Sequence, residues 1–251
     1  MHIRLDGRVA LVTGAAQGIA QAISRTLSAA GARVEVADID GERLQAFAGA
    51  EGLRAHVLDV SDREVAHKLI SDVVSERGRL DVLVNAAGGV RGQVGRPIEE
   101  ISEADWRVLF QSNVDGAFWL SQAAATPMRA ARYGRIINIA SSAGLRPSLT
   151  GIQAYTAAKH ALVGLTKQLS QDLGPHGITC NAVAPGLIRS NPATERQWES
   201  YGPDGQKRII EAIHTRRLGA PADIASAVTF FASDQAAWVS GQILSVDGGR
   251  S

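Results

Sequence analysis

Tyr155 and Lys159 lie four residues apart in a stretch, residues 153–165, that is rich in alanine and has apolar residues at helical spacing. Positions i and i+4 share one face of a helix, so we expect the phenol and the ammonium to lie side by side. A tyrosine with a pKa of about 10 becomes a base near neutral pH only if that pKa falls by roughly three units, or about 4 kcal/mol. One cation at about 4 Å supplies roughly this energy at an effective dielectric of about 20. The pair is therefore suited to proton transfer, although an isolated Tyr-x-x-x-Lys is more often a half-buried tyrosine and a solvated lysine.

A glycine-rich turn lies between an apolar strand and a helix near the N-terminus. Residues 8–13 form the strand, residues 14–20 the turn, and the helix runs to about Ala30. Backbone N–H groups in such a turn cradle a pyrophosphate. A second apolar strand ends at Asp38, about twenty residues after the turn, where a carboxylate accepts hydrogen bonds from ribose hydroxyls. Asp38 would repel a 2′-phosphate, and Gln17 stands in a turn without Arg or Lys, so the pattern favours NAD over NADP. The alternatives are a simple tight turn, and Asp38 as a cap of the helix after Asp40-Gly41.

These segments resemble the classical short-chain dehydrogenase/reductase family, and the resemblance covers nearly the whole chain. Residues 13–20 are similar to its Thr-Gly-x-x-x-Gly-x-Gly, with Ala20 in place of the last glycine. The resemblance implies one NAD-binding α/β domain over residues 1–251. Its expected fold is a Rossmann-type, doubly wound, seven-stranded parallel sheet with helices on both faces, as the alternation of apolar strands and helical stretches also indicates.

The resemblance also assigns cofactor contacts. Asp59-Val60 resembles the pair that lines the adenine, although Asp59 could instead cap the helix start at Ser61–Asp62. The segment from Asn85 to Gly88 resembles Asn-Asn-Ala-Gly, with Ala86 replacing the second asparagine, which we expect to loosen the central sheet. Residues 185–190 resemble the loop that fixes the nicotinamide. The expected cofactor contacts are Gly14, Gln17, Gly18, Ile19, Asp38, Asp59, Val60, Asn85, Gly88, Tyr155, Lys159, Pro185, Gly186, Ile188 and Ser190.

The same resemblance completes a catalytic set of Asn113, Ser141, Tyr155 and Lys159. Counting back from Gly144 places Ser141 at the position of the family's catalytic serine, and Ser142 is the alternative. Either serine could instead have only a structural role in a turn at the end of the strand. In the implied mechanism, Tyr155 exchanges a proton with the substrate hydroxyl. Lys159 lowers the tyrosine pKa and binds the nicotinamide ribose, Ser141 holds the substrate oxygen, and Asn113 relays protons through water.

Composition excludes several other functions. The formal net charge of +1 and the lack of a basic block argue against a nucleic-acid ligand. No apolar run is long enough to span a bilayer, and the charged start at Arg4–Arg8 leads straight into the first strand, so we expect no signal peptide and a cytoplasmic protein. The single cysteine, Cys180, lies in an apolar strand and is expected to be buried and structural. His160 is expected to have a packing or interface role, and the histidines lack metal-ligand spacing, so no metal site is assigned.

Residues 191–217 resemble the family's mobile substrate lid, although an ordinary helical excursion explains them equally well. Trp198 and Tyr201 among charged residues suit a cover over a polar substrate. Arg91, Arg146 and Arg189 fall in loops at the expected ligand-binding edge of the sheet, where they could read a carboxylate, phosphate or sulfonate. A solvated loop arginine is the plainer explanation for each alone.

We therefore expect a dehydrogenase that transfers hydride between NAD and a secondary alcohol of a sugar, polyol or other polar small molecule, which could be anionic. The alternative is a 3-oxoacyl-[acyl-carrier-protein] reductase-like thioester reductase. A nucleotide-sensing scaffold without chemistry is disfavoured by the complete Ser, Tyr, Lys and Asn set. The resemblance further implies a homotetramer assembled through helices around residues 104–131 and 154–173 and through the last strand.

Overall fold

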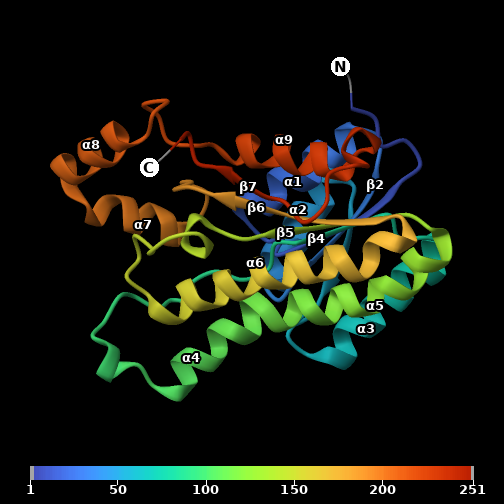
Figure 1. Ribbon diagram of the computed structural model, residues 1–251, viewed down its shortest axis with the longest axis horizontal. Helices are drawn as coiled ribbons and strands as arrows, with labels where there is room; N and C mark the ends of the chain where they lie inside the picture. The colour runs from blue at the N-terminus through green and yellow to red at the C-terminus, as the bar shows by residue number, and fades with distance from the viewer. Residues whose placement is uncertain (1–2, 250–251) are drawn as a thin grey trace.

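The computed structural model describes residues 3–249. Its centre is a seven-stranded, fully parallel sheet with the strand order β3-β2-β1-β4-β5-β6-β7 (Figure 1). This architecture confirms the predicted doubly wound fold. The strands are β1 (Val9–Thr13), β2 (Arg33–Asp38), β3 (Arg54–Val57), β4 (Val82–Asn85), β5 (Gly134–Ile139), β6 (Ile178–Pro185) and β7 (Ile243–Val246).

Helices cover both faces of the sheet because the side chains of each central strand alternate between two cores. Ala10 and Val12 of β1 belong to the core beneath α1 (Gly18–Ala29), α2 (Gly41–Glu51) and α9 (Pro221–Ala232). Val9 and Leu11 belong to the opposite core, beneath α3 (Arg63–Arg77), α5 (Gly116–Ala131) and α6 (Gln153–Leu173). The long helices α5 and α6 run together along the lower side of the sheet in Figure 1.

The strand order fixes where a ligand can bind. The chain winds outward from β1 through β2 to β3, and then restarts at β4 on the other side of β1. At this switch point, the helices that follow β1 and β4 pass to opposite faces of the sheet, which is where a ligand-binding crevice forms at the carboxyl edge. The loops after β5 and β6 end at the same edge, so the predicted site residues are brought together.

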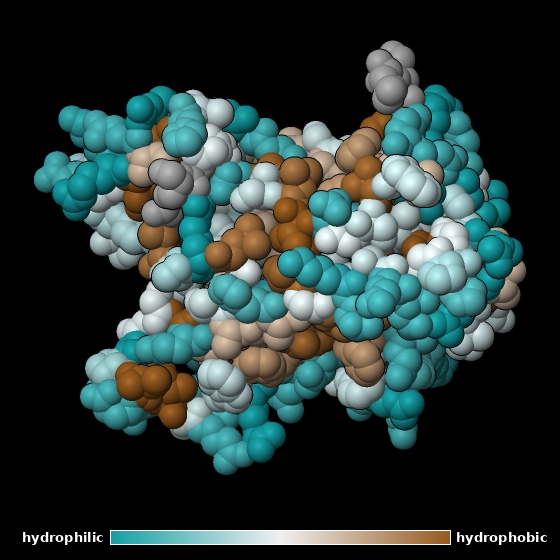
Figure 2. All heavy atoms as spheres, in the orientation of Figure 1, coloured by the Kyte–Doolittle hydropathy of each residue, from teal (hydrophilic) through white to brown (hydrophobic). Residues whose placement is uncertain are grey.

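A helical excursion between β6 and α9 stands apart from the two helix layers. It contains α7 (Pro192–Ser200) and α8 (Gly202–Ala212), and Ile188 and Gly219 close its base by a parallel bridge. The space-filling view is hollowed between this excursion and the region that includes α4 (Glu103–Phe110) (Figure 2). Within residues 3–249, no helix combines the length and apolar character that crossing a membrane requires.

A buried carboxylate joins two strands at the amino edge of the sheet, opposite the carboxyl edge that carries the site loops. Asp81, which precedes β4, is 1% exposed, and its carboxylate accepts hydrogen bonds from Val9 N at 2.8 Å, Arg79 Nε at 2.7 Å and Arg8 Nη1 at 3.3 Å. The acid therefore joins the amino ends of β1 and β4, on the side of the sheet away from the loops that carry the site.

We predict that Asp81→Ala lowers the free energy of unfolding by about 3 kcal/mol, because two guanidinium groups lose a buried partner. Urea denaturation measures the change. Asp72→Ala, which removes only the exposed partner of Lys68, is the control and should stay within about 0.5 kcal/mol of the parent protein. Equal effects of the two variants would contradict a role for Asp81 in joining the strands.

Candidate active site

Tyr155, Lys159 and Ser141 meet at the carboxyl end of β5. Tyr155 lies in the first turn of α6, and Lys159 follows one turn later on the same face, with Nζ 5.8 Å from the centre of the Tyr155 ring. The lysine is 4% exposed, and Nζ donates a hydrogen bond to the Ile139 carbonyl at 2.9 Å. The Ser141 hydroxyl hydrogen-bonds Tyr155 and accepts a bond from Ala143 N at 3.1 Å.

Burial dominates the protonation of this pair. It raises the pKa of Tyr155, and the hydrogen bond from Ser141 opposes that rise. Burial also lowers the pKa of Lys159 to about 8. The net direction of the tyrosine pKa in this structure is therefore upward, and not downward as predicted, because desolvation is its largest cause. The Lys159 ammonium meanwhile donates to the Ile139 carbonyl. At neutral pH, Tyr155 is a protonated phenol.

Asn113 is buried and anchors the loop that follows β4. It lies in a π-helical segment (Gln111–Asp115) between α4 and α5. Its Nδ2 donates to the carbonyls of Gly89 and Leu109, each at 2.9 Å, and its Oδ1 accepts from Gly89 N at 2.9 Å. A Cβ on Gly88 would lie 2.5 Å from that Oδ1, so the close approach requires glycine. The amide is thus fully engaged, and a π-turn of this kind is frequent at functional sites.

The glycine-rich turn packs tightly against two other loops of the site. Gly14 and Gly18 have positive φ, and a Cβ on them would lie 2.7 Å from the Ala86 carbonyl oxygen and 2.9 Å from the Ser190 carbonyl oxygen. Helix α1 starts at Gly18 without a side-chain cap, so its first N–H groups face the crevice without a side-chain acceptor. Close backbone approach and uncapped N–H groups fit a pyrophosphate.

The Thr13 hydroxyl bonds the backbone at Ala86, the position where the family motif has its second asparagine. It accepts hydrogen bonds from Ala86 N at 3.1 Å and Ala87 N at 3.2 Å, and it donates to Val84 O at 3.4 Å. The end of β4 is therefore tied to the end of β1 without a second asparagine. Sequence analysis missed this role, although Thr13 stands inside the motif.

Asp38 is half-buried at the end of β2 and contacts the glycine-rich turn. Its Oδ2 accepts from Ala16 N and its Oδ1 from Asp40 N, both at 2.9 Å. Asp40, and not Asp38, caps α2 by accepting from Arg43 N. The capping alternative for Asp38 is thereby removed, and its position beside the turn fits contact with a ribose.

Other predicted cofactor residues differ in how they can contribute. Asp59 is exposed and accepts from Ser61 N at 2.9 Å, while Asp62 caps α3. The side chain of Asn85 points into the core, where Nδ2 donates to Asn138 Oδ1 at 2.8 Å, so only its backbone faces the crevice. Asn138 donates in turn to Thr166 Oγ1 at 2.9 Å. This buried network beneath the site was also missed, and its signal was an asparagine inside the apolar run of β5.

The loop after β6 brings the remaining predicted residues to the crevice. Pro185 ends β6, Gly186 touches Asp247, and Ile188 is buried at the base of the excursion. Ser190 is partly exposed, and its N–H donates to Thr194 Oγ1 at 3.0 Å. Gln17 and Ile19 flank Gly18 at the crevice, and Val60 follows Asp59 at the end of the β3 loop.

The three candidate arginines differ in their partners. Arg146 Nη2 pairs with Asp247 Oδ2 at 3.0 Å, and Arg189 binds Glu195 Oε2 through Nε at 2.8 Å and Nη2 at 2.6 Å. Arg91 is exposed with φ of 50°, and within residues 3–249 it forms no hydrogen bond or ion pair. It follows Val90, which packs in one cluster with Tyr155. Of the three, Arg91 has the guanidinium available to a ligand.

Other reactive groups do not assemble a second centre. Burial raises the pKa of Cys180 to about 12, so its thiol is protonated and packed. His160 is exposed, and its Nδ1 lies 2.9 Å from the Thr156 carbonyl oxygen on its own helix. In the described part of the chain, His, Cys, Asp and Glu residues form no group of three that could hold a metal ion.

Comparison with known proteins places the chain among oxidoreductases. A family model described as enoyl-(acyl carrier protein) reductase matches residues 14–251. The chain is 36% identical to (2S)-[(R)-hydroxy(phenyl)methyl]succinyl-CoA dehydrogenase subunit BbsD of Thauera aromatica, over 98% of each protein. It is 35% identical to 3-oxoacyl-[acyl-carrier-protein] reductase FabG of Thermotoga maritima, over 98% of this chain and 99% of the relative.

Two further matches widen the range of substrates among similar proteins. D-threitol dehydrogenase of Mycolicibacterium smegmatis is 37% identical, over 98% of this chain and 94% of the relative. The crystal structure of levodione reductase superposes with a TM-score of 0.91 at 30% identity, and the match covers 98% of each chain.

Proposed function

Because the chain belongs to the short-chain dehydrogenase/reductase family, we propose that it is an NAD-dependent oxidoreductase that interconverts a secondary alcohol and the corresponding carbonyl compound. The observation that carries the proposal is the meeting of Ser141, Tyr155 and Lys159 at the end of β5, at the same edge of the sheet as the glycine-rich turn. A protonated phenol, a buried ammonium and a hydroxyl are the groups that proton transfer to a carbonyl oxygen requires.

The residues at the crevice fit a dinucleotide. The first N–H groups of α1 would bind the pyrophosphate, and Asp38 would accept from the ribose hydroxyls, which supports NAD over NADP. The backbone of Ile188 and the hydroxyl of Ser190 would hold the carboxamide. When bound, NAD supplies the hydride acceptor for alcohol oxidation.

In the proposed reaction, Ser141 donates a hydrogen bond to the substrate oxygen and Tyr155 moves the proton. For reduction, the phenol gives its proton to the carbonyl oxygen, and for oxidation the phenolate takes the hydroxyl proton. Lys159 stabilises the phenolate that forms, because its charge lies one helical turn away. Asn113 holds the Gly89 backbone in place, so a proton relay at this position would use its backbone carbonyl rather than its engaged amide.

The substrate we propose is a sugar, polyol or other polar hydroxylated molecule, and Arg91 would bind an anionic group on it. The similarity to D-threitol dehydrogenase and the free guanidinium of Arg91 support this class. Residues 191–217 would act as the substrate lid, in which Trp198 of α7 packs with Ile209 of α8 and with Ile213, which follows α8.

A thioester reductase is the second candidate. The chain is similar to the 3-oxoacyl-[acyl-carrier-protein] reductase and to BbsD, which favours a thioester reductase. The similarity to D-threitol dehydrogenase favours a polyol dehydrogenase equally strongly. Val94, Leu145 and Leu149 are exposed in the loops after β4 and β5, and they would suit an acyl chain. Both candidates use the same catalytic groups and differ in the loops.

We also propose a homotetramer in the cytoplasm. Trp238, 99% exposed, and Leu244 of β7 form apolar surface beside the last strand, which supports its use in assembly. Sedimentation of the purified protein tests the tetramer.

We predict that Tyr155→Phe lowers turnover by about 10²–10⁴-fold while NAD affinity stays nearly unchanged, because the phenyl ring keeps the packing and loses the proton. The assay follows NADH formation with paired charged and uncharged sugars, polyols and hydroxy acids. The same assay in reverse follows acetoacetyl thioester reduction with NADH and NADPH. Parent activity on one alcohol class supports the first candidate, and activity on the thioester alone supports the second. Unchanged turnover in Tyr155→Phe would refute the catalytic assignment.

Ser141→Ala should move the pH profile of alcohol oxidation. Oxidation needs the phenolate, so its rate rises with pH through the tyrosine pKa, and loss of the Ser141 hydrogen bond raises that pKa further. The alkaline rise in kcat/KM therefore shifts to higher pH. Ser142→Ala is the matched control, since its hydroxyl is not the Tyr155 partner and its backbone carbonyl still accepts from Leu145 N. A shift in the control alone would assign the role to Ser142.

Asp38→Ala should narrow the preference for NAD over NADP by about tenfold, because the variant loses a charge-assisted bond to NAD and no longer repels the 2′-phosphate. Dissociation constants for NADH and NADPH, measured by fluorescence titration, give the ratio. Asp40→Ala controls for loss of a nearby carboxylate that caps α2. An unaltered ratio in Asp38→Ala would exclude Asp38 as the selector.

A further inference from the structure

Asp247 lies where three loops of the site converge. It follows β7, and its side chain is 8% exposed. Its Oδ1 accepts from Gly249 N and its Oδ2 from Ser245 Oγ, each at 3.0 Å. Both carboxylate oxygens therefore accept hydrogen bonds from residues two positions away in the chain, which hold the side chain in place within its own turn.

The first contact is with the loop after β6. Gly186 N donates to Val246 O at 3.1 Å, and a Cβ on Gly186 would lie 2.8 Å from the Asp247 Cβ. The Asp247 backbone thus packs directly against the loop proposed to hold the nicotinamide.

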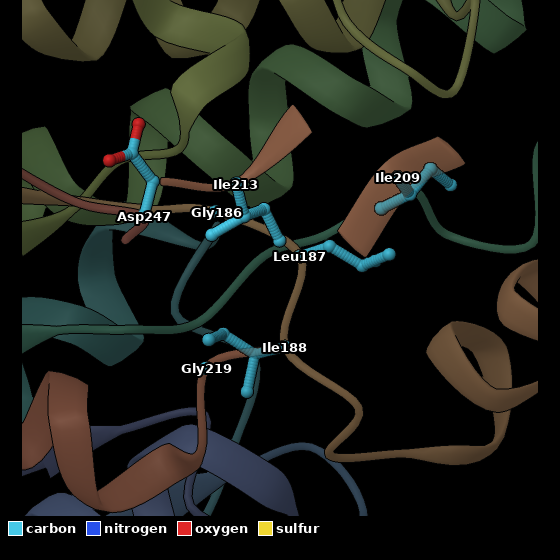
Figure 3. A pocket seen from close by; sticks show the side chains of 7 residues that line it. All are labelled: Gly186, Leu187, Ile188, Ile209, Ile213, Gly219 and Asp247. Atoms are coloured by element: carbon cyan, nitrogen blue, oxygen red, sulfur yellow. The ribbon is translucent and has the colours of Figure 1, made fainter. Parts of the chain in front are cut away.

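The second contact is with the base of the α7–α8 excursion. Thr215 N donates to Gly248 O at 3.1 Å, and a Cβ on Gly248 would lie 2.6 Å from Ile213 Cγ2. Between this base and the loop after β6 lies a small cavity, lined by Gly186, Leu187, Ile188, Ile209, Ile213, Gly219 and Asp247 (Figure 3). The cavity lies between Ile209 and Ile213 of the excursion and Gly186 and Leu187 of the loop after β6.

The third contact is the ion pair with Arg146. This arginine belongs to the segment that starts at Ser141, and its own N–H donates to the Ser142 carbonyl at 3.1 Å. The pair joins residues 101 positions apart, with the guanidinium about a third exposed and the carboxylate nearly buried. A partly buried pair between otherwise separate loops holds them more firmly than a surface pair does.

We propose that Arg146 and Asp247 form a positioning pair, which sets the distance between the segment carrying Ser141 and the base of the α7–α8 excursion. The inference rests on the proposed function, because it assigns to that excursion the role of substrate lid. Arg146 then acts through Asp247 and does not read an anion on the substrate. Neutralising either partner frees the excursion to move and weakens substrate binding, whatever the charge of the substrate.

The test compares Arg146→Gln, Asp247→Asn and the double variant with Arg146→Lys, which keeps the charge. Arg25→Gln is the matched control, since it removes a partly exposed pair with Glu51 that joins α1 and α2, at 2.7 Å. We expect KM to rise about tenfold in both single variants, with kcat and NADH affinity within about twofold of the parent. The double variant should match the singles, and Arg146→Lys should recover most of the loss.

Substrate charge separates positioning from anion binding. A positioning pair gives the same rise in KM for a hydroxy acid and for an uncharged polyol. A rise confined to the hydroxy acid in Arg146→Gln, with tighter hydroxy-acid binding in Asp247→Asn, would show an anion-reading arginine and overturn the proposal. Additive effects in the double variant would overturn it as well.

Hydrogen exchange supplies a readout that needs no substrate. Backbone amides in residues 142–151 and 209–219 should exchange faster together in Arg146→Gln and Asp247→Asn, with NADH present, and stay at the parent rate in Arg25→Gln. Unchanged exchange in both segments overturns the positioning pair even if the protein proves active. Absence of any NAD-linked turnover in the parent protein would instead count against the proposed function.

Discussion

The burial of Lys159 is the constraint on which the geometry of the site depends. An ammonium removed from water is costly unless it is bound, and here it donates to the neutral carbonyl of Ile139 at the end of β5. Within the described residues it forms no ion pair, and desolvation by burial lowers its pKa to about 8. The bond ties α6 to the sheet edge and so places Tyr155 beside Ser141. A lysine kept in such surroundings without a carboxylate partner is better explained by chemistry than by stability.

The sequence predicts the fold and most of the site because its signals are local. Strand, turn and helix in residues 9–29, and the four-residue spacing of Tyr155 and Lys159, determine geometry within one or two elements. The carboxyl edge of a parallel sheet then collects the loops. The sequence could not show the bond of Lys159 to Ile139, and a Coulomb estimate that omitted desolvation gave the wrong direction for the tyrosine pKa. The contacts that the sequence did not reveal join segments far apart in the chain, as the hydrogen bond between Thr13 and Ala86 does.

Close packing gives the crevice two unequal halves. On the cofactor side, Gly14, Gly18, Gly88 and Gly186 allow approaches that a Cβ would block, so loops from three strands lie in direct backbone contact. Such a surface has few ways to deform. On the side that we propose for the substrate, the α7–α8 excursion is held by the Ile188–Gly219 bridge, the Thr215–Gly248 bond and the Arg146–Asp247 pair, with a small cavity at its base.

Relatives with different substrates share similar identity with the chain. The polyol dehydrogenase and the oxoacyl reductase are 37% and 35% identical to it, and each match covers 98% of the chain. In the proposed function, hydride and proton transfer use the closely packed half, and recognition of the substrate depends on loops, which in general tolerate change. Those loops contain three arginines. Arg189 is bound by Glu195 and Arg146 by Asp247, so the arginine that we propose for charge recognition is Arg91, on a strained backbone next to the residue that packs with Tyr155.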